Sequence, residues 1–482
     1  MKGIEIINAS AGSGKTYSLT ARVNDLLQNG LAPEGLMATT FTNKAAAELR
    51  ERIRLELLSH NHQDEAQRIF DGFVGTVNSV CARLLTEYAL DAGLSPALDV
   101  LPEEDGTRLF QIAIAEVIAM QAGRIEPAAN RLDRKGGGSS FQPLADWRDD
   151  VRKIVDIARA NQLDSTELQK CADRSWASLK DLFGAVSTKD LTDRLLARIQ
   201  NAINDINQIS APKQDTQKAL TALTSFSRTM KREGEVHWSD WIRLSTLRAN
   251  KDADGMLEEV KDIAARVMEH PDFQEDVKQL IYGVFKCAGE ALETYDTFKR
   301  KQGLMDFVDQ ETMVLDLARN NRAFQNSMQD RLQQMMVDEF QDTSPIQLAL
   351  FLELHRLAGK SVWVGDPKQA IYSFRGTDPE LMHEVTKQIT ATSTLNYSWR
   401  SCEGLVRFTN AIFTAVFHAM GKDNVCLDIP QQRKEAAQGG FIESWNLPAK
   451  NVREEAHGLA AGINDLLKRR PDIQPGDIAV LC

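Results

Sequence analysis

Short apolar runs alternate with amphipathic stretches over the first sixty residues. The run IEIINAS at 4–10 leads into a Gly/Ser-rich turn and then into a stretch whose apolar face carries Leu19, Val23, Leu26 and Leu27. A second run, GLMATTF at 35–41, precedes the amphipathic stretch KAAAELRERIRLELL at 44–58. This strand–helix–strand–helix order predicts a parallel α/β sheet.

Two further buried strands are predicted by QQMMVDEF at 333–340 and KSVWVGD at 360–366, each with acidic residues at its end. Between about 91 and 301 the pattern changes to long helical stretches with few strand signals. We interpret this segment as an all-α insertion that leaves the α/β domain and returns to it. Its tryptophans are interpreted as core side chains, namely Trp147, Trp176, Trp238 and Trp241.

The C-terminal part predicts a second α/β unit that begins after about residue 386. REEAHGLAAGINDLLK at 453–468 has the spacing of an amphipathic helix, and DIAVLC at 477–482 is expected to start a strand. An apolar strand at a sheet edge needs partners, so we expect this second unit to be cut partway.

Composition narrows the class of protein. The 482 residues carry a net charge of −11, which excludes a uniformly basic nucleic-acid-binding surface but leaves room for a local basic groove. The six cysteines show no C-x-x-C spacing, so zinc and redox motifs are unsupported. The N-terminus lacks a signal peptide, and no apolar run approaches the roughly 18 residues that span a bilayer. We expect a cytoplasmic protein without membrane contact.

The segment ASAGSGKT at 9–16 lies between a predicted strand and a predicted helix, as a phosphate-binding loop requires. Its glycines let successive N–H groups face a phosphate, and the helix N-terminus adds partial positive charge. The lysine is suited to the β- and γ-phosphates of ATP, and the threonine hydroxyl is suited to Mg²⁺. The first position of the motif is Ala9 where glycine is usual. The predicted ligand set is Ala11, Gly12, Ser13, Gly14, Lys15 and Thr16.

Acidic residues at the end of a later strand complete the expected chemistry. Asp338 is suited to hold Mg²⁺ directly or through water, and Glu339 is suited to orient and deprotonate the attacking water. Ser344, Pro345 and Gln347 then predict a helix start, with Ser at the N-cap, Pro at the first helical position and Gln in the capping box.

The segment VGDPKQAIYSFRGTD at 364–378 combines two ligand types after a buried strand. Gln369 and Arg375 are groups that suit a phosphate, whereas Tyr372 and Phe374 are rings on which bases stack. Because stacking on an aromatic ring tolerates any base, this loop is suited to join nucleotide chemistry to a grip on nucleic acid.

These segments together resemble superfamily 1 helicases of the UvrD/Rep type. ASAGSGKT resembles their first motif, TTFTNKAAAELRERI their DNA-contacting motif Ia, and VGTVNSVCARLL the following motif, which usually has His where Asn78 stands. VDEFQDTSPIQ is similar to their Walker B motif, VGDPKQAIYSFRGTD to motif III and LNYSWRS to motif IV. GLMDFVDQ resembles the family's segment that returns to the first motor domain. The tryptophan in WRS and the large helical insertion are most similar to the RecB/AddA branch of helicase-nucleases, which process double-strand breaks.

The resemblance implies a role for each matching residue. Catalysis is assigned to Asp338, Glu339, Gln369, Arg375 and Arg400, and Trp399 would stack on adenine. The groove for single-stranded DNA is assigned to Phe41, Thr42, Asn43, Lys44, Thr76, Asn78, Tyr372 and Phe374.

The resemblance also implies a motor of two RecA-like domains. Residues 1–90 and 301–385 would form the first, 91–300 the insertion and 386–482 the start of the second. Two later motifs of the second domain, one with a further arginine for the γ-phosphate, and an upstream glutamine motif do not appear in the 482 residues. Either the chain belongs to a longer motor or a partner completes it. In both cases we expect these residues alone to hydrolyse ATP slowly.

The expected function is that of an ATP-dependent DNA helicase or translocase moving 3′ to 5′. It would act on single-stranded DNA, or on duplex with a 3′ single-stranded end, in repair, recombination, break processing or anti-phage defence, with a nuclease domain or partner subunit. The alternative is an ATP-gated DNA sensor that loads or regulates a nuclease without unwinding. Both use the same residues. A metabolic P-loop kinase would explain neither FTNKAAAELRERI nor the paired aromatics.

Overall fold

The computed structural model describes residues 2–94, 99–101, 103–139, 142–143, 145–187, 190–234, 237–370 and 379–481. The chain divides into two compact units, of which the first is Met1–Ile6 with Thr20–Ala391 and the second is Ile7–Leu19 with Thr392–Cys482. Strand β1 (Ile4–Ala9) contributes residues to each unit.

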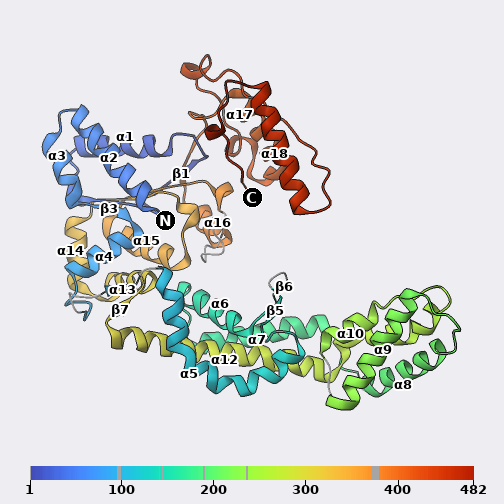
Figure 1. Cartoon of the computed structure of the whole chain (residues 1–482). Coiled ribbons are helices and arrows are strands. Elements are labelled where there is room, and N and C mark those ends of the chain that lie inside the picture. The colour runs from blue at the N-terminus through green and yellow to red at the C-terminus, as the bar shows by residue number, and fades with distance from the viewer. Residues whose placement is uncertain are drawn as a thin grey trace. The chain divides into compact units, whose positions relative to one another are not determined.

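A six-stranded sheet with the order β10-β1-β9-β8-β2-β3 positions the site (Figure 1). The pairs β2–β3, β2–β8 and β8–β9 are parallel. Strands β2, β8 and β9 are buried along their whole lengths, as in sheets that are covered on both faces. The predicted α/β class with a parallel sheet is confirmed. The other strands are β2 (Leu36–Thr40), β3 (Phe73–Thr76), β8 (Gln334–Val337), β9 (Ser361–Gly365) and β10 (Ala391–Leu395).

Helices connect these strands, because parallel neighbours need crossover connections. The predicted capping box at Ser344 and Gln347 is confirmed at the start of α15. The helices are α1 (Lys15–Gln28), α2 (Asn43–Ser59), α3 (Gln63–Arg68), α4 (Val77–Glu87), α13 (Phe307–Asn320), α14 (Arg322–Arg331), α15 (Pro345–Ala358) and α16 (Pro379–Lys387).

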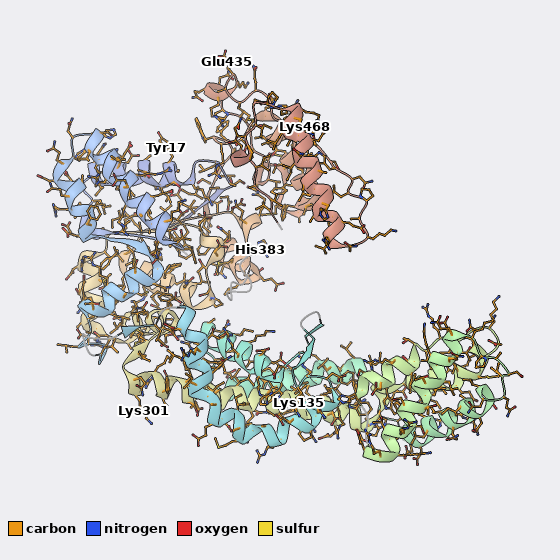
Figure 2. The ribbon with its side chains drawn as sticks, viewed as in Figure 1. Tyr17, Lys135, Lys301, His383, Glu435 and Lys468 are labelled. Carbon is orange, nitrogen blue, oxygen red and sulfur yellow. The ribbon has the colours of Figure 1, made fainter. Side chains whose placement is uncertain are left out.

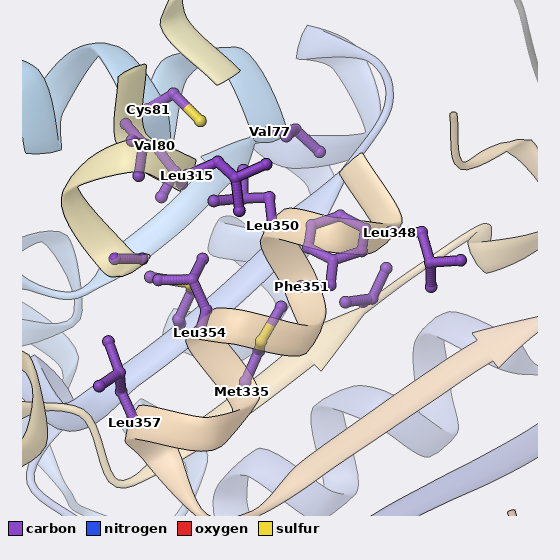
Figure 3. Close-up of a cluster of buried hydrophobic side chains, with 14 of the residues drawn as sticks. Val77, Val80, Cys81, Leu315, Met335, Leu348, Leu350, Phe351, Leu354 and Leu357 are labelled. Atoms are coloured by element: carbon purple, nitrogen blue, oxygen red, sulfur yellow. The ribbon is translucent and has the colours of Figure 1, made fainter. Parts of the chain in front are cut away.

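The main apolar core lies between the sheet and helices α4, α13, α14 and α15. Figure 3 shows Met335 of β8 among Leu350, Phe351 and Leu354 of α15, with Leu315 of α13 nearby. These side chains are no more than 2% exposed, so the strand that carries the predicted Walker B acids is anchored in a dry interior.

The insertion is helical apart from strands of two residues each, as predicted. Two of those strands, β4 (Asp99–Val100) and β7 (Leu304–Met305), pair in parallel and join the outgoing and returning chain. Helices α5 and α12 run alongside each other (Figure 1) and share one core with α6 and α7. The remaining elements are α5 (Glu103–Arg131), β5 (Gly138–Ser139), β6 (Gln142–Pro143), α6 (Trp147–Ala160), α7 (Ser165–Phe183), α8 (Leu191–Ile206), α9 (Gln214–Glu233), α10 (Trp238–Ser245), α11 (Glu258–Ala264) and α12 (Pro271–Gln302).

The tryptophans of the insertion follow the core interpretation in three of four cases. Trp147, Trp238 and Trp241 are buried, whereas Trp176 is only half-buried. Among the described residues, no helix is long and apolar enough to cross a membrane.

The second unit contains α17 (Glu403–Val416) and α18 (Val452–Arg469). The predicted helix at 453–468 is confirmed, but its apolar face is at most half-buried. The predicted strand at 477–482 is wrong over its described part, because 478–481 have no strand structure and Leu481 is 96% exposed. Apolar composition alone cannot form a strand where no neighbouring strand accepts its hydrogen bonds.

Candidate functional site

The phosphate loop, residues 9–16, has the backbone geometry that its sequence predicts. It connects β1 to α1, and Gly12 and Gly14 adopt φ values of +75° and +89°, which side chains other than glycine rarely tolerate. The Ser13 N–H donates to the Ser10 carbonyl at 3.0 Å, which closes the turn. Lys15 begins α1 and Thr16 follows, so both lie at a helix N-terminus.

This loop fits a nucleotide phosphate. The Ser13 hydroxyl is buried and has no hydrogen-bond partner among the described residues, which is a polar group in need of a ligand. The positive-φ glycines and the N-terminus of α1 provide N–H donors and positive potential at one place. The Thr16 hydroxyl and the Asp338 carboxylate are hard oxygen donors of the type that Mg²⁺ prefers.

The predicted adenine-stacking residue lies beside this loop. We call residues 396–401 the tryptophan turn. The Trp399 N–H donates to the Gly12 carbonyl at 2.8 Å, and a Cβ built on Gly14 would lie 3.3 Å from Cδ1 of Trp399. A Cβ on Gly12 would lie 2.9 Å from Cβ of Arg400, so both glycines are needed for this close approach. The structure therefore brings Trp399 and Arg400 to the phosphate loop, within the second unit.

Tyr17 is a residue that the sequence reasoning missed. It follows Thr16 on the first turn of α1, is 74% exposed and points outward from the helix (Figure 2). Trp399, in the same unit, is 49% exposed. Two large rings open to solvent near a phosphate loop are a flat apolar surface of the kind that a nucleobase covers. The signal in the sequence was an aromatic residue immediately after the GKT triplet.

The acidic pair lies where β8 ends. The Asp338 N–H continues the sheet by donating to the Thr39 carbonyl at 2.8 Å, and the Asp338 carboxylate accepts the Glu339 N–H at 3.0 Å. Glu339 has φ +54° and ψ +42°, in the left-handed region. For a residue with a side chain, this conformation costs on the order of 1 kcal/mol or more, and such strain concentrates at functional sites.

Strand β9 ends in a second polar cluster next to β8. The Asp366 carboxylate is buried, accepts from Gln369 Nε2 at 2.7 Å and pairs with Lys368 Nζ at 2.8 Å. Gln341, in the turn after Glu339, accepts the Asp366 N–H at 2.9 Å and donates to Glu339 at 2.9 Å. Predicted residues Glu339 and Gln369 thus belong to one hydrogen-bonded network. Gln341, Asp366 and Lys368 were missed, although the segments DEFQD and GDPKQ contain them.

The predicted DNA contacts gather at the ends of β2 and β3. Thr40 of β2 pairs with Thr76 of β3 in parallel register, so α2 and α4 both begin at this edge. Thr42 and Thr76 are the N-caps of these helices and accept from Ala45 N and Ser79 N, each at 3.1 Å. Adjacent helix N-termini attract phosphates. Asn43 and Lys44 are exposed here, and Phe41 and Asn78 are half-buried.

The remaining predicted site residues, Tyr372, Phe374 and Arg375, lie outside the described residues. The two ligand types of the 364–378 loop are therefore described only as far as Ala370.

A buried acid lies behind the acidic pair. Burial raises the pKa of Glu311 on α13 to about 7, although Gln347 Nε2 donates to its carboxylate at 2.7 Å and opposes the shift. Burial, with the Glu311 charge second, also raises the pKa of the Cys81 thiol well above its usual range. Gln347 belongs to the capping box that starts α15, so this acid supports the segment following the Walker B acids.

Comparison with known proteins gives a family match and curated relatives. The model of the UvrD/REP helicase N-terminal domain matches residues 1–390. An ATP-dependent helicase/nuclease subunit of Streptococcus agalactiae is 24% identical over 458 residues, covering 85% of this chain and 37% of the relative. The proteins of the same name from Streptococcus uberis and Streptococcus mutans are 23% and 24% identical over 466 and 459 residues, with the same coverage. The chain thus spans little more than a third of these relatives' length.

A parallel α/β sheet with a phosphate loop after its β1 strand defines a nucleotide-binding protein of the P-loop class. Within that class, the chain belongs to the UvrD/Rep helicase family, since the match covers most of its length. The resemblance drawn from the sequence motifs is confirmed.

Proposed function

We propose that this chain carries the ATP-hydrolysing part of a superfamily 1 DNA helicase or translocase that moves 3′ to 5′ on single-stranded DNA. Residues 1–90 and 301–385 would form the first motor domain, 91–300 its insertion and 386–482 the start of the second. The proposal includes a cytoplasmic location, a nuclease domain or partner subunit, and a role in DNA repair, recombination, break processing or anti-phage defence.

One observation carries the proposal. The carboxyl ends of adjacent parallel strands hold both the Glu339–Gln369 network, at β8 and β9, and the paired helix N-termini, at β2 and β3. The first set suits phosphoryl chemistry and the second suits a sugar–phosphate backbone. A protein that only transferred phosphate to a small molecule would not need the second set.

The chemistry follows from the residues in each place. Lys15 and the loop N–H groups would bind the β- and γ-phosphates, and Trp399 with Tyr17 would face the adenine. Glu339 would accept a proton from water as the water oxygen bonds to the γ-phosphorus. The bond to the bridging oxygen then breaks, and ADP leaves with that electron pair. Gln369, Arg375 and Arg400 would approach the γ-phosphate. Mg²⁺, when bound by Thr16 and Asp338, would neutralise charge on the phosphate oxygens.

The testing experiment measures ATP hydrolysis by the purified natural gene product, with and without single-stranded DNA. Strand displacement is then measured on duplexes with a 3′ or a 5′ tail. We expect DNA-stimulated hydrolysis and displacement from the 3′ tail. Lys15→Ala should abolish turnover without unfolding the protein, while Lys301→Ala, at an exposed lysine of α12 (Figure 2), should have no effect.

The outcomes separate the proposal from its rival. Stimulated hydrolysis without displacement or translocation would favour the ATP-gated sensor that loads or regulates a nuclease. The relatives' name, which joins helicase and nuclease in one subunit, is the observation that keeps this second function in view. Absence of any ATP turnover, or full turnover in Lys15→Ala, would overturn the assignment of the phosphate loop.

A further inference from the structure

We infer that Gln341 is a positioning residue for ATP hydrolysis, which orients the Glu339 carboxylate and couples it to the turn that carries Gln369. The inference rests on the proposed function, because it assigns Glu339 the role of accepting the water proton. Gln341 itself would touch neither ATP nor water. It would act by fixing where the Glu339 carboxylate lies when the γ-phosphate is present.

The contacts of the Gln341 amide connect two strand ends. Its Nε2 donates to Glu339 Oε2 at 2.9 Å and to Asp342 Oδ2 at 3.1 Å. Its Oε1 accepts the backbone N–H of Asp366 at 2.9 Å. The residue is 6% exposed, so these bonds form away from bulk water, where replacing one with nothing leaves a polar group unsatisfied.

The end of β9 is shaped around this amide. A Cβ built on Gly365 would lie 2.7 Å from Gln341 Oε1 and 3.1 Å from the Gln341 backbone nitrogen. Gly365 has no positive φ, so its lack of a side chain is explained by this approach and not by backbone conformation. One layer away, Phe340 stacks on Trp363 with ring centroids 4.5 Å apart. The turn after β8 and the end of β9 are therefore held at a fixed separation.

The connection continues to the residue that would sense the γ-phosphate. Asp366 receives the Gln341 contact through its backbone and binds Gln369 Nε2 through its carboxylate at 2.7 Å. Lys368 Nζ pairs with the same carboxylate at 2.8 Å, so the acid is neutralised and fixed in orientation. A movement of Gln369 on nucleotide binding would be transmitted through Asp366 and Gln341 to Glu339.

Glu339 has particular need of such support. Its backbone lies in the left-handed region, and its side chain extends from a turn instead of a strand or helix. A carboxylate that must receive a proton from water works only within a narrow range of positions, and a displacement of about 1 Å can lower turnover roughly 100-fold. A neutral amide donor fixes the carboxylate without adding a competing charge.

Two substitutions separate positioning from simple packing. Gln341→Met has a similar volume and removes both polar contacts. Gln341→Glu keeps an acceptor for the Asp366 N–H but can no longer donate to Glu339. Gln347→Met is the matched control, since it also removes a glutamine-to-carboxylate hydrogen bond in the same segment, at Glu311. All variants are made in the natural gene product, and folding is verified by thermal unfolding.

We expect both Gln341 variants to lower kcat of DNA-stimulated hydrolysis roughly 10- to 100-fold, with KM for ATP changed less than about 2-fold. Gln347→Met should retain kcat. If Gln341→Glu keeps wild-type kcat while Gln341→Met loses it, only the link to β9 matters and the inference is wrong. It is equally wrong if both retain kcat, or if KM rises in step with the loss. Inactive wild-type protein would instead refute the proposed function.

Discussion

The backbone N–H of Trp399 donates to the carbonyl oxygen of Gly12 at 2.8 Å, which fastens the tryptophan turn to the phosphate loop within one compact unit. The turn is itself fixed from behind, because Ser398 N–H donates to Asp428 O at 2.8 Å and Arg433 Nη1 donates to Ser398 O at 3.0 Å. The indole is therefore held in place before any nucleotide arrives, and little conformational entropy remains to be lost on binding.

Trp399→Ala should weaken ATP binding about 5- to 10-fold, since an aromatic stacking contact is worth about 1–1.5 kcal/mol. Trp399→Phe should recover most of the affinity because it keeps a ring. Isothermal titration calorimetry with a non-hydrolysable ATP analogue would measure both. Tyr397→Ala is the matched control, as Tyr397 is 51% exposed and lies two residues away. Equal losses in the Trp399 and Tyr397 variants would show that the effect comes from disturbing the turn.

Lys44→Ala should weaken binding to single-stranded DNA and also change its salt dependence. Lys44 is exposed on the first turn of α2, beside the paired N-caps Thr42 and Thr76. Loss of one phosphate contact should lower the slope of log K against log salt by about 0.7. Fluorescence anisotropy with a labelled oligonucleotide between low and moderate salt would measure it. Lys301→Ala, exposed at the end of α12, should leave the slope unchanged, and an unchanged slope in Lys44→Ala would remove Lys44 from the groove.

The local parts of the site were predictable from sequence. The phosphate loop announces itself because only glycine tolerates φ values such as +75° and +89°, and the flanking apolar periods identify the strand and helix. The capping box at Ser344 likewise depends on neighbours three residues apart. Both features are determined by short-range stereochemistry, which one sequence is sufficient to reveal.

The contacts across long sequence separations were not predictable. Gln341 and Asp366 are 25 residues apart, and Gly12 and Trp399 meet only because the chain returns to β1 after the insertion. The predicted strand at 477–482 was wrong for the same reason, since an apolar run becomes a strand only when tertiary structure supplies a partner. Periodicity records which face is apolar, but it does not record what that face will meet.

Glu311 should make stability fall as the pH rises from about 5 to 8. The folded state keeps its proton up to about pH 7, whereas the unfolded state releases it near 4.5, so the folded state binds more protons between these values. The shift corresponds to about 3 kcal/mol of lost stability above pH 7. Glu311→Gln should remove this loss, because its side chain can still accept the Gln347 hydrogen bond and carries no charge.

Urea unfolding at pH 5 and pH 8 would measure the Glu311 effect. Wild-type protein should lose stability between the two values, and Glu311→Gln should lose much less. Glu293→Gln, at an exposed carboxylate of α12, is the control and should follow wild type. Parallel pH trends in wild type and Glu311→Gln would show that Glu311 is ionised in the folded protein.

The junction between the insertion and the returning chain is a buried ionic cluster. Arg159 of α6 and Lys299 of α12 both contact Asp306 and Asp309, which form the capping box of α13. The Lys299 side chain is 3% exposed and its Nζ lies 4.4 Å from the ring centroid of Tyr295. Burial raises the pKa of Asp306, but Arg159 and Lys299 outweigh it and hold the pKa at about 2.

Arg159→Met should lower the free energy of unfolding by about 3–5 kcal/mol, because it leaves buried carboxylates short of positive charge. Lys387→Met, which breaks the exposed pair with Glu384 on α16, should cost less than about 1 kcal/mol. The Asp306 contribution is present above pH 3.8 and is lost as the pH falls towards 2, so acid should narrow the gap between Arg159→Met and wild type. Urea unfolding at pH 7 and pH 3 measures both effects. Similar losses from the two substitutions at pH 7 would show that the junction is held by apolar packing.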